Sequence, residues 1–285
     1  MAAAPGGGTG APRANLAGST HAAAGSTHAA TAAAARCGLA TRGVLYVVVG
    51  VLALRIAFGR ADKAADRTGA LAELAGHPFG RVLVWAVGIG LAAMALWRLS
   101  EAVFGAAGPD GRKLGKRFAS GARAAFYTVT AFSALSFAAG RGGGSSGDAQ
   151  SRDVTARVLA VPAGQWLVGA AGIAVAVGGV VVAVGAARLT FREEMDTARL
   201  SRGARLVVDA LGVVGGVARG AVFTAAGTFL VYAAVSYDPG KAKGLDDTLR
   251  SFARTPAGPW LLVAVASGLL LFGLFSWATA VWRRV

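Results

Sequence analysis

Six long apolar segments constrain what this chain can fold into more than any other feature. A helix needs about 20 predominantly apolar residues to cross the hydrocarbon core of a bilayer. The sequence therefore predicts an all-α, polytopic membrane protein with six transmembrane helices. The six segments cover residues 43–59, 80–97, 124–139, 164–187, 220–236 and 259–282.

Composition supports a membrane environment over an aqueous one. Hydrophobic residues make up 55% of the 285 residues and charged residues only 15%, whereas soluble proteins carry about 25% charged residues. The net charge of +15 would suit nucleic acid, but the basic residues are spread between the apolar segments. We expect membrane lipids, including anionic lipids, and an unknown protein as partners, and no nucleic acid.

The chain contains three tandem copies of one two-helix pattern. Each copy opens with arginine, a small residue, two variable residues and an aromatic residue, and continues with Pro-x-Gly. Because a copy with two spans preserves its own orientation, we expect three parallel two-helix repeats around a pseudo-threefold axis. The openings begin at Arg42, Arg123 and Arg219, and the Pro-x-Gly motifs begin at Pro78, Pro162 and Pro256.

These copies divide the chain into four regions. We expect the Ala- and Gly-rich residues 1–35 to form a disordered cytoplasmic tail, because they contain almost no large apolar side chains. Repeat 1 then covers residues 36–105, repeat 2 residues 106–200 and repeat 3 residues 201–285.

Small residues recur at seven-residue intervals in the first helix of each copy. This interval keeps them on one helix face, and such faces allow close approach of helix backbones in lipid. The spacing predicts helix-packing surfaces at Gly43, Gly50, Ala57, Ala124, Ala131, Ala138, Gly220, Gly227 and Ala234.

An acidic residue precedes each Pro-x-Gly by nine to twelve positions, at Asp66, at Asp153 and at the pair Asp246 and Asp247. A short amphipathic segment follows each one, which we interpret as an interfacial helix. The aspartates are then N-caps, because their oxygens can accept hydrogen bonds from unpaired backbone N–H groups. A ring that binds an ion is the alternative.

Arg42, Arg123 and Arg219 occupy the same position in all three copies. One interpretation is that they anchor the helices at the cytoplasmic surface. The alternative is an anion or lipid-phosphate site, because guanidinium groups bind phosphate oxygens in pairs. The distribution of Lys and Arg over the connections places both termini in the cytoplasm, in a multi-pass protein of the plasma membrane.

The sequence provides no catalytic, cofactor-binding or metal-binding residues. Residues 143–147 spell Gly-x-Ser-x-Gly, but they lie in a Gly- and Ser-rich connection without the strand and helix that a nucleophile elbow requires. His21 and His28 lie in the tail and are too few for a closed zinc site. No Asp, Glu or His lies inside an apolar segment, which disfavours proton coupling.

The repeat resembles a known family of bacterial, chiefly actinobacterial, membrane proteins, the family of domain of unknown function 1206. The similarity lies in the opening at 42–46, in Gly69-Ala70-Leu71 before Pro78, and in Trp97-Arg98. It extends over residues 36–285 and implies a six-helix plasma-membrane protein without an assigned activity. We therefore expect a non-enzymatic membrane scaffold or a lipid- or partner-interacting component. The alternative is a small transporter or channel, not coupled to protons, along the pseudo-threefold axis.

Overall fold

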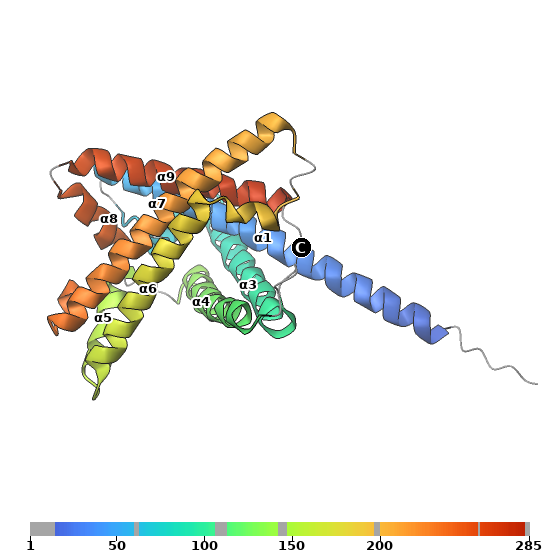
Figure 1. The fold of residues 1–285 in the computed structure, drawn as a ribbon, viewed down its shortest axis with the longest axis horizontal. Helices are drawn as coiled ribbons and strands as arrows, with labels where there is room; N and C mark the ends of the chain where they lie inside the picture. Colours follow the sequence, from blue (N-terminus) through green and yellow to red (C-terminus); the bar gives the residue numbers. More distant parts are fainter. Residues whose placement is uncertain are drawn as a thin grey trace, which may run out of the picture.

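The computed structural model describes residues 15–59, 63–105, 113–141, 147–196, 200–255 and 257–282, with side chains from residue 32 onward. These ranges contain helices and no β-strand (Figure 1). The short helices are α2 (Arg67–Ala75), α5 (Gly147–Leu159), η1 (Thr190–Glu194), η3 (Pro239–Lys241) and α8 (Leu245–Ala253). The long helices are α1 (Asn15–Ala57), α3 (Gly80–Phe104), α4 (Leu114–Ala138), α6 (Gly164–Ala187), α7 (Arg202–Val235) and α9 (Gly258–Trp282).

Five of the long helices are long and apolar enough to cross a membrane, counted over the residues that the structure describes. The prediction of a helical membrane protein with three two-helix repeats is confirmed, whereas the structure does not establish six spans. The sixth long helix, α4, has 25 residues, which is sufficient length. Arg123 and several hydroxyl side chains lower its hydropathy below that of the other five.

Helix α1 begins at Asn15, upstream of residue 36, where the sequence predicts that the first repeat starts. Residues 15–35, which we expected to be disordered, are therefore helical in the structure. Alanine has the highest intrinsic helix propensity, and this segment is rich in alanine. Residues 1–14 of the predicted tail lie outside the described residues.

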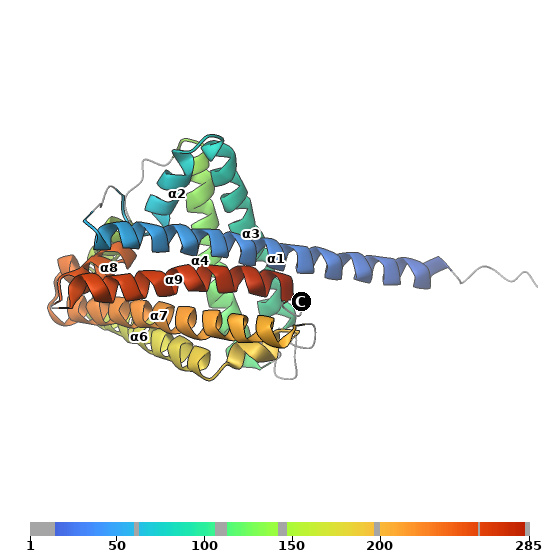
Figure 2. The same ribbon diagram turned by 90° about the horizontal axis from the view of Figure 1, so that it is seen from above.

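The long helices pair across the boundaries between copies. Helix α3 packs against α4, α6 against α7, and α9 against α1, and each pair is antiparallel (Figures 1 and 2). Every pair thus joins the second helix of one copy to the first helix of the next, and α9 closes the cycle on α1. In Figure 2 the α3/α4 pair runs across the direction of the α1/α9 pair.

The predicted small-residue faces lie at these pairings. A Cβ on Gly50 would lie 2.7 Å from Leu270 Cγ and 3.0 Å from the carbonyl oxygen of Ala266 on α9. A Cβ on Gly227 would overlap the backbone of α6 at Ala176. Gly43 meets α9 and Gly220 meets α6 in the same way, and the alanines of the set are buried or half-buried: Ala57, Ala124, Ala131, Ala138 and Ala234.

The Pro-x-Gly motif forms a tight turn between a short helix and a long one. In the first and second copies the middle residue of the motif has a left-handed backbone conformation, with φ +62° at both Phe79 and Ala163. The glycine then begins the long helix directly beside the end of the short helix. A Cβ on Gly80, Gly164 or Gly258 would overlap a backbone carbonyl of that short helix. The motif is therefore explained by chain geometry.

Candidate functional site

The three short helices α2, α5 and α8 belong to different copies and are joined by an aspartate ring, which consists of Asp66, Asp148 and Asp246. Each of these carboxylates accepts a hydrogen bond from a backbone N–H group of the next copy, so the ring closes on itself. The donors and acceptors are Gly147 N to Asp66 Oδ2 (2.7 Å), Asp247 N to Asp148 Oδ2 (3.1 Å) and Ala65 N to Asp246 Oδ1 (2.7 Å).

The prediction that aspartates cap the short helices is correct for Asp66, the N-cap of α2, whose Oδ1 accepts from Gly69 N at 2.8 Å. It is wrong for Asp153, which lies in the middle of α5 and is exposed. It is also wrong for Asp246 and Asp247, which lie inside the first turn of α8, whose N-cap is Gly244. Helix α5 is longer than α2 and α8, so the residue at its start lies further from the proline. Asp148 therefore takes the place in the ring that the spacing assigned to Asp153.

The ring is crowded with negative charge. Burial, followed by the nearby carboxylates of Asp247 and Asp246, raises the pKa of Asp148 to about 6. Among the described acidic residues, Asp148, Asp246 and Asp247 form a group whose ligand atoms lie within 4.8 Å of one another. The sequence pattern allowed an ion-binding ring as the alternative for Asp246 and Asp247, but that ring did not include Asp148, which only the contact between α5 and α8 brings beside them.

A central cavity of about 360 Å³ lies next to the aspartate ring. It is lined by α1, α3, α4, α6 and α7, and by the starts of α2, α5 and α8. Helices α1 and α3 pack together, as do α7 and α9, but α4 does not pack closely against α6. The cavity thus lies beside the second copy, whose two long helices, α4 and α6, are separated from each other. Its cationic lining residues are Arg42, Arg67, Arg219 and Lys243.

Arg42 and Arg219, from the first and third copies, both contact the aromatic ring of Phe272. Their guanidinium carbons are 5.1 Å and 4.9 Å, respectively, from the ring centroid of Phe272. Arg42 Nε donates to Ser276 Oγ at 2.8 Å, and Arg219 Nε donates to the Tyr46 hydroxyl at 2.8 Å. These contacts fix both half-buried arginines in the cavity wall while using only part of the five donors that each guanidinium carries.

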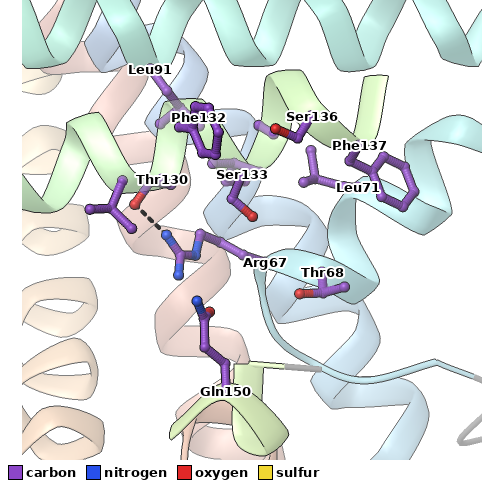
Figure 3. A pocket seen from close by; sticks show the side chains of 13 residues that line it. Arg67, Thr68, Leu71, Leu91, Thr130, Phe132, Ser133, Ser136, Phe137 and Gln150 are labelled. Carbon is purple, nitrogen blue, oxygen red and sulfur yellow. Dashed lines mark hydrogen bonds between the residues drawn. The ribbon is translucent and has the colours of Figure 1, made fainter. Parts of the chain in front are cut away.

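Arg67 of α2 is a third cation on this cavity, and it also lines an adjoining cavity of about 290 Å³ (Figure 3). Its guanidinium donates to Thr130 Oγ1, drawn as a dashed line in Figure 3, and lies 5.4 Å from the ring centroid of Phe126. Burial lowers the pKa of Arg67, and the neighbouring Asp66 opposes this effect. Arginine nevertheless stays charged at neutral pH.

The structure brings together two of the three repeated arginines and leaves out the third. Arg123 is exposed on α4 and does not line the central cavity. Sequence reasoning did not identify Arg67 or Lys243, and it noted Tyr127 only as the aromatic residue that opens the second copy; all three line the cavity. Arg67 directly follows the predicted cap Asp66, but the repeat pattern contains no signal for it, because the other copies have no arginine at this position.

Within the described part of the chain, Arg42, Arg67 and Arg219 form no salt bridge with an acidic side chain. Among the described residues that line the cavity, Asp66 is the one acidic residue, and both of its oxygens accept from backbone N–H groups. The cavity therefore combines an excess of positive charge with apolar walls from α1, α6 and α7. Such a lining is suited to an anionic group attached to apolar material.

The fold and this site define a helical membrane protein in which three tandem two-helix repeats surround a cationic cavity. The chain belongs to the family described as Domain of Unknown Function (DUF1206), which matches residues 37–105, 118–189 and 214–283. It is 32% identical over 252 residues to the uncharacterized protein YxxB of Bacillus subtilis (strain 168), covering 88% of this chain and 90% of that protein. No solved structure matches the chain.

Proposed function

We propose that the protein binds an anionic membrane lipid in the central cavity and acts as a non-enzymatic component of the membrane. The observation that carries this proposal is the placement of Arg42 and Arg219 side by side on one cavity without acidic partners among the described residues. Leaving two cations half-buried in a membrane domain is costly unless a counter-charge is present. An anionic lipid headgroup supplies that counter-charge.

The chemistry of the cavity favours a phosphate-containing headgroup. A guanidinium group presents planar, paired donors that match phosphate oxygens, and charge-assisted hydrogen bonds of this kind are stronger than neutral ones. The hydroxyl groups of Ser276 and Tyr46 accept hydrogen bonds from the Nε atoms of Arg42 and Arg219, respectively, so both guanidinium groups are oriented before the ligand binds. Preorganised donors bind a ligand with a smaller loss of conformational entropy.

Apolar residues on the same wall favour a lipid over a free inorganic anion. Val175 of α6 and Val222, Phe223 and Leu230 of α7 line the cavity together with Arg219. Val175 is also exposed on α6, and α4 and α6 do not pack closely, so we infer that a lipid can reach this wall from the bilayer. A lipid that enters sideways would place its headgroup on the arginines and its chain along α6 and α7.

A transporter for a small anion is the second candidate. The cavity lies where the three helix pairs meet, which is the place that a path along the pseudo-threefold axis would pass. Anion uptake into vesicles that contain the purified protein would favour this candidate, and lipid retention without uptake would favour the first.

The arginines can be tested with conservative substitutions and a matched control. We expect the double variant Arg42→Lys, Arg219→Lys to lose most of its co-purifying anionic phospholipid, because lysine keeps the charge and removes the paired donors. Arg123→Lys is the control, since it changes the same repeat position away from the cavity. Native mass spectrometry of the purified protein measures bound lipid, and thermal unfolding verifies the fold. Equal lipid content in the double variant and the wild type would contradict the proposal.

The orientation in the membrane is part of the same proposal. The connections between apolar segments are numbered in chain order, so that the second follows residues 80–97 and the fourth follows residues 164–187. Both termini and these two even-numbered connections carry the larger share of Lys and Arg, which favours a cytoplasmic location for them in a plasma-membrane protein. The aspartate ring then lies on the opposite side, because α2, α5 and α8 all belong to odd-numbered connections.

A further inference from the structure

The contact between α5 and α8 gathers three carboxylates from two different copies. Asp148 belongs to the second copy, and Asp246 and Asp247 belong to the third. Their ligand atoms lie within 4.8 Å of one another. Ca²⁺ binds oxygen ligands at about 2.3 to 2.6 Å, so two oxygens on opposite sides of one ion are about 4.6 to 5.2 Å apart. All three carboxylates are thus close enough to contact a single ion.

One oxygen of this group has no partner. Asp148 is buried, with 3% of its surface exposed, and its Oδ1 accepts no hydrogen bond from the described residues. The other two carboxylates of the ring have both oxygens occupied: Asp66 Oδ1 accepts from Gly69 N, and Asp246 Oδ2 accepts from Arg250 Nε, each at 2.8 Å. A buried acceptor without a donor lowers the stability of the fold. Among the three carboxylates of the aspartate ring, this applies to Asp148 alone.

The surrounding charges leave this oxygen uncompensated. Arg250 pairs with Asp246, and Arg152 pairs with Asp247. Asp148 forms no salt bridge within the described part of the chain, and its other oxygen accepts from the backbone N–H of Asp247. The group therefore contains more carboxylates than guanidinium groups, and the excess negative charge is at Asp148.

A glycine of the third copy lies beside the unpartnered oxygen of Asp148. Gly244 lies directly against Oδ1, and a Cβ at this position would overlap that oxygen. Gly244 therefore allows this close approach of the backbone to the Asp148 carboxylate, which a side chain at position 244 would prevent.

We propose that Asp148, Asp246 and Asp247 form a binding site for a divalent, oxygen-preferring cation of the Ca²⁺ or Mg²⁺ type. The Asp148 Oδ1 atom is the principal ligand, Asp247 and Asp246 are the additional carboxylates, and water completes the coordination, as is common for both ions. The ion links α5 of the second copy to α8 of the third. It thereby strengthens the aspartate ring beside the open side of the cavity. This site is independent of the lipid proposed for the cavity.

The test uses the purified full-length protein, treated with a chelator and then titrated with CaCl₂ or MgCl₂ at pH 7.5. We expect saturable binding of at least one of the two ions by calorimetry. A cation that binds the folded protein raises its midpoint of thermal unfolding, by mass action. Asp148→Asn should abolish both effects. Asp153→Asn should retain both, because Asp153 is an exposed carboxylate on the same helix outside the group.

A second substitution guards against loss of folding. If Asp148→Asn does not yield folded protein, Asp247→Asn tests the same site from α8, and its cation affinity should fall at least tenfold. The absence of saturable binding of Ca²⁺ and Mg²⁺ to the wild type would overturn the proposal. Binding that persists unchanged in a folded Asp148→Asn variant would overturn it as well.

Discussion

Two neighbouring glycines of α6 allow a sharp test of the packing between helix pairs. Gly179 is buried against α7, and a Cβ there would lie 2.5 Å from Thr224 N and 2.7 Å from the carbonyl oxygen of Gly220. Gly178 is exposed, and a Cβ there would meet no atom within 4 Å outside the local helix. The same chemical change at the two positions therefore differs only in what the added methyl group contacts.

We expect opposite effects of alanine at these positions. Gly178→Ala should raise the free energy of unfolding by up to about 1 kcal/mol, because alanine favours the helix. Gly179→Ala should lower it by about 1 to 3 kcal/mol, because the obstructing atoms are mostly backbone and the helices must separate. For a protein of this size, a difference of about 1 to 4 kcal/mol corresponds to roughly 2 °C or more in the midpoint of thermal unfolding.

The assay is thermal unfolding of both purified variants in one detergent, followed by tryptophan fluorescence. Equal midpoints for the two variants would show that α6 and α7 do not approach each other as closely as the structure indicates. A stabilising effect of Gly179→Ala would contradict the packing assignment for this whole pair.

Three further predictions follow from other parts of the chain. Deleting residues 2–31 should leave the thermal midpoint unchanged, whereas deleting residues 2–39 should lower it, because Ala35 and Leu39 are fully buried. Glu73 has a lowered pKa because a lysine side chain donates a hydrogen bond to it. This pair stabilises the fold above the unfolded-state pKa of about 4.3, so Glu73→Gln should cost about 0.5 kcal/mol at pH 7 and nothing well below pH 4, measured by unfolding at both pH values. In a variant without the native cysteine, Gly144→Cys should react with a membrane-impermeant thiol reagent in intact cells and Thr197→Cys should not; reversed labelling would invert the proposed orientation.

The sequence contained enough information for the helices and their small-residue faces. Glycines at seven-residue intervals indicate a close approach of two backbones, and Gly50 and Gly227 lie at such contacts. The spacing did not identify the partner helix, because a face of small residues can pack against any neighbouring helix that also lacks bulky side chains at the contact. Pairing across copies was therefore visible only in the structure.

The candidate site was predictable only in part, for two physical reasons. The three-copy pattern indicated Arg42 and Arg219, but it also indicated Arg123, which α4 carries to the exposed surface because α4 does not pack closely against α6. Counting back from the proline led to Asp153 and missed Asp148, because the short helices differ in length. Repeat symmetry predicts positions well where the copies have equal lengths and equal packing, and both conditions fail in the second copy.

The pairing of helices across copies also determines what a single copy could do alone. A separate two-helix copy would expose the small-residue face of its first helix, because the partner of that face belongs to the preceding copy. Three identical copies could bury these faces by assembling as a cyclic homotrimer, in which each protomer covers the first helix of its neighbour. The closure of α9 on α1 reproduces this arrangement within one chain. A circularly permuted chain that begins at α4 and joins the present termini would therefore retain all three helix pairs.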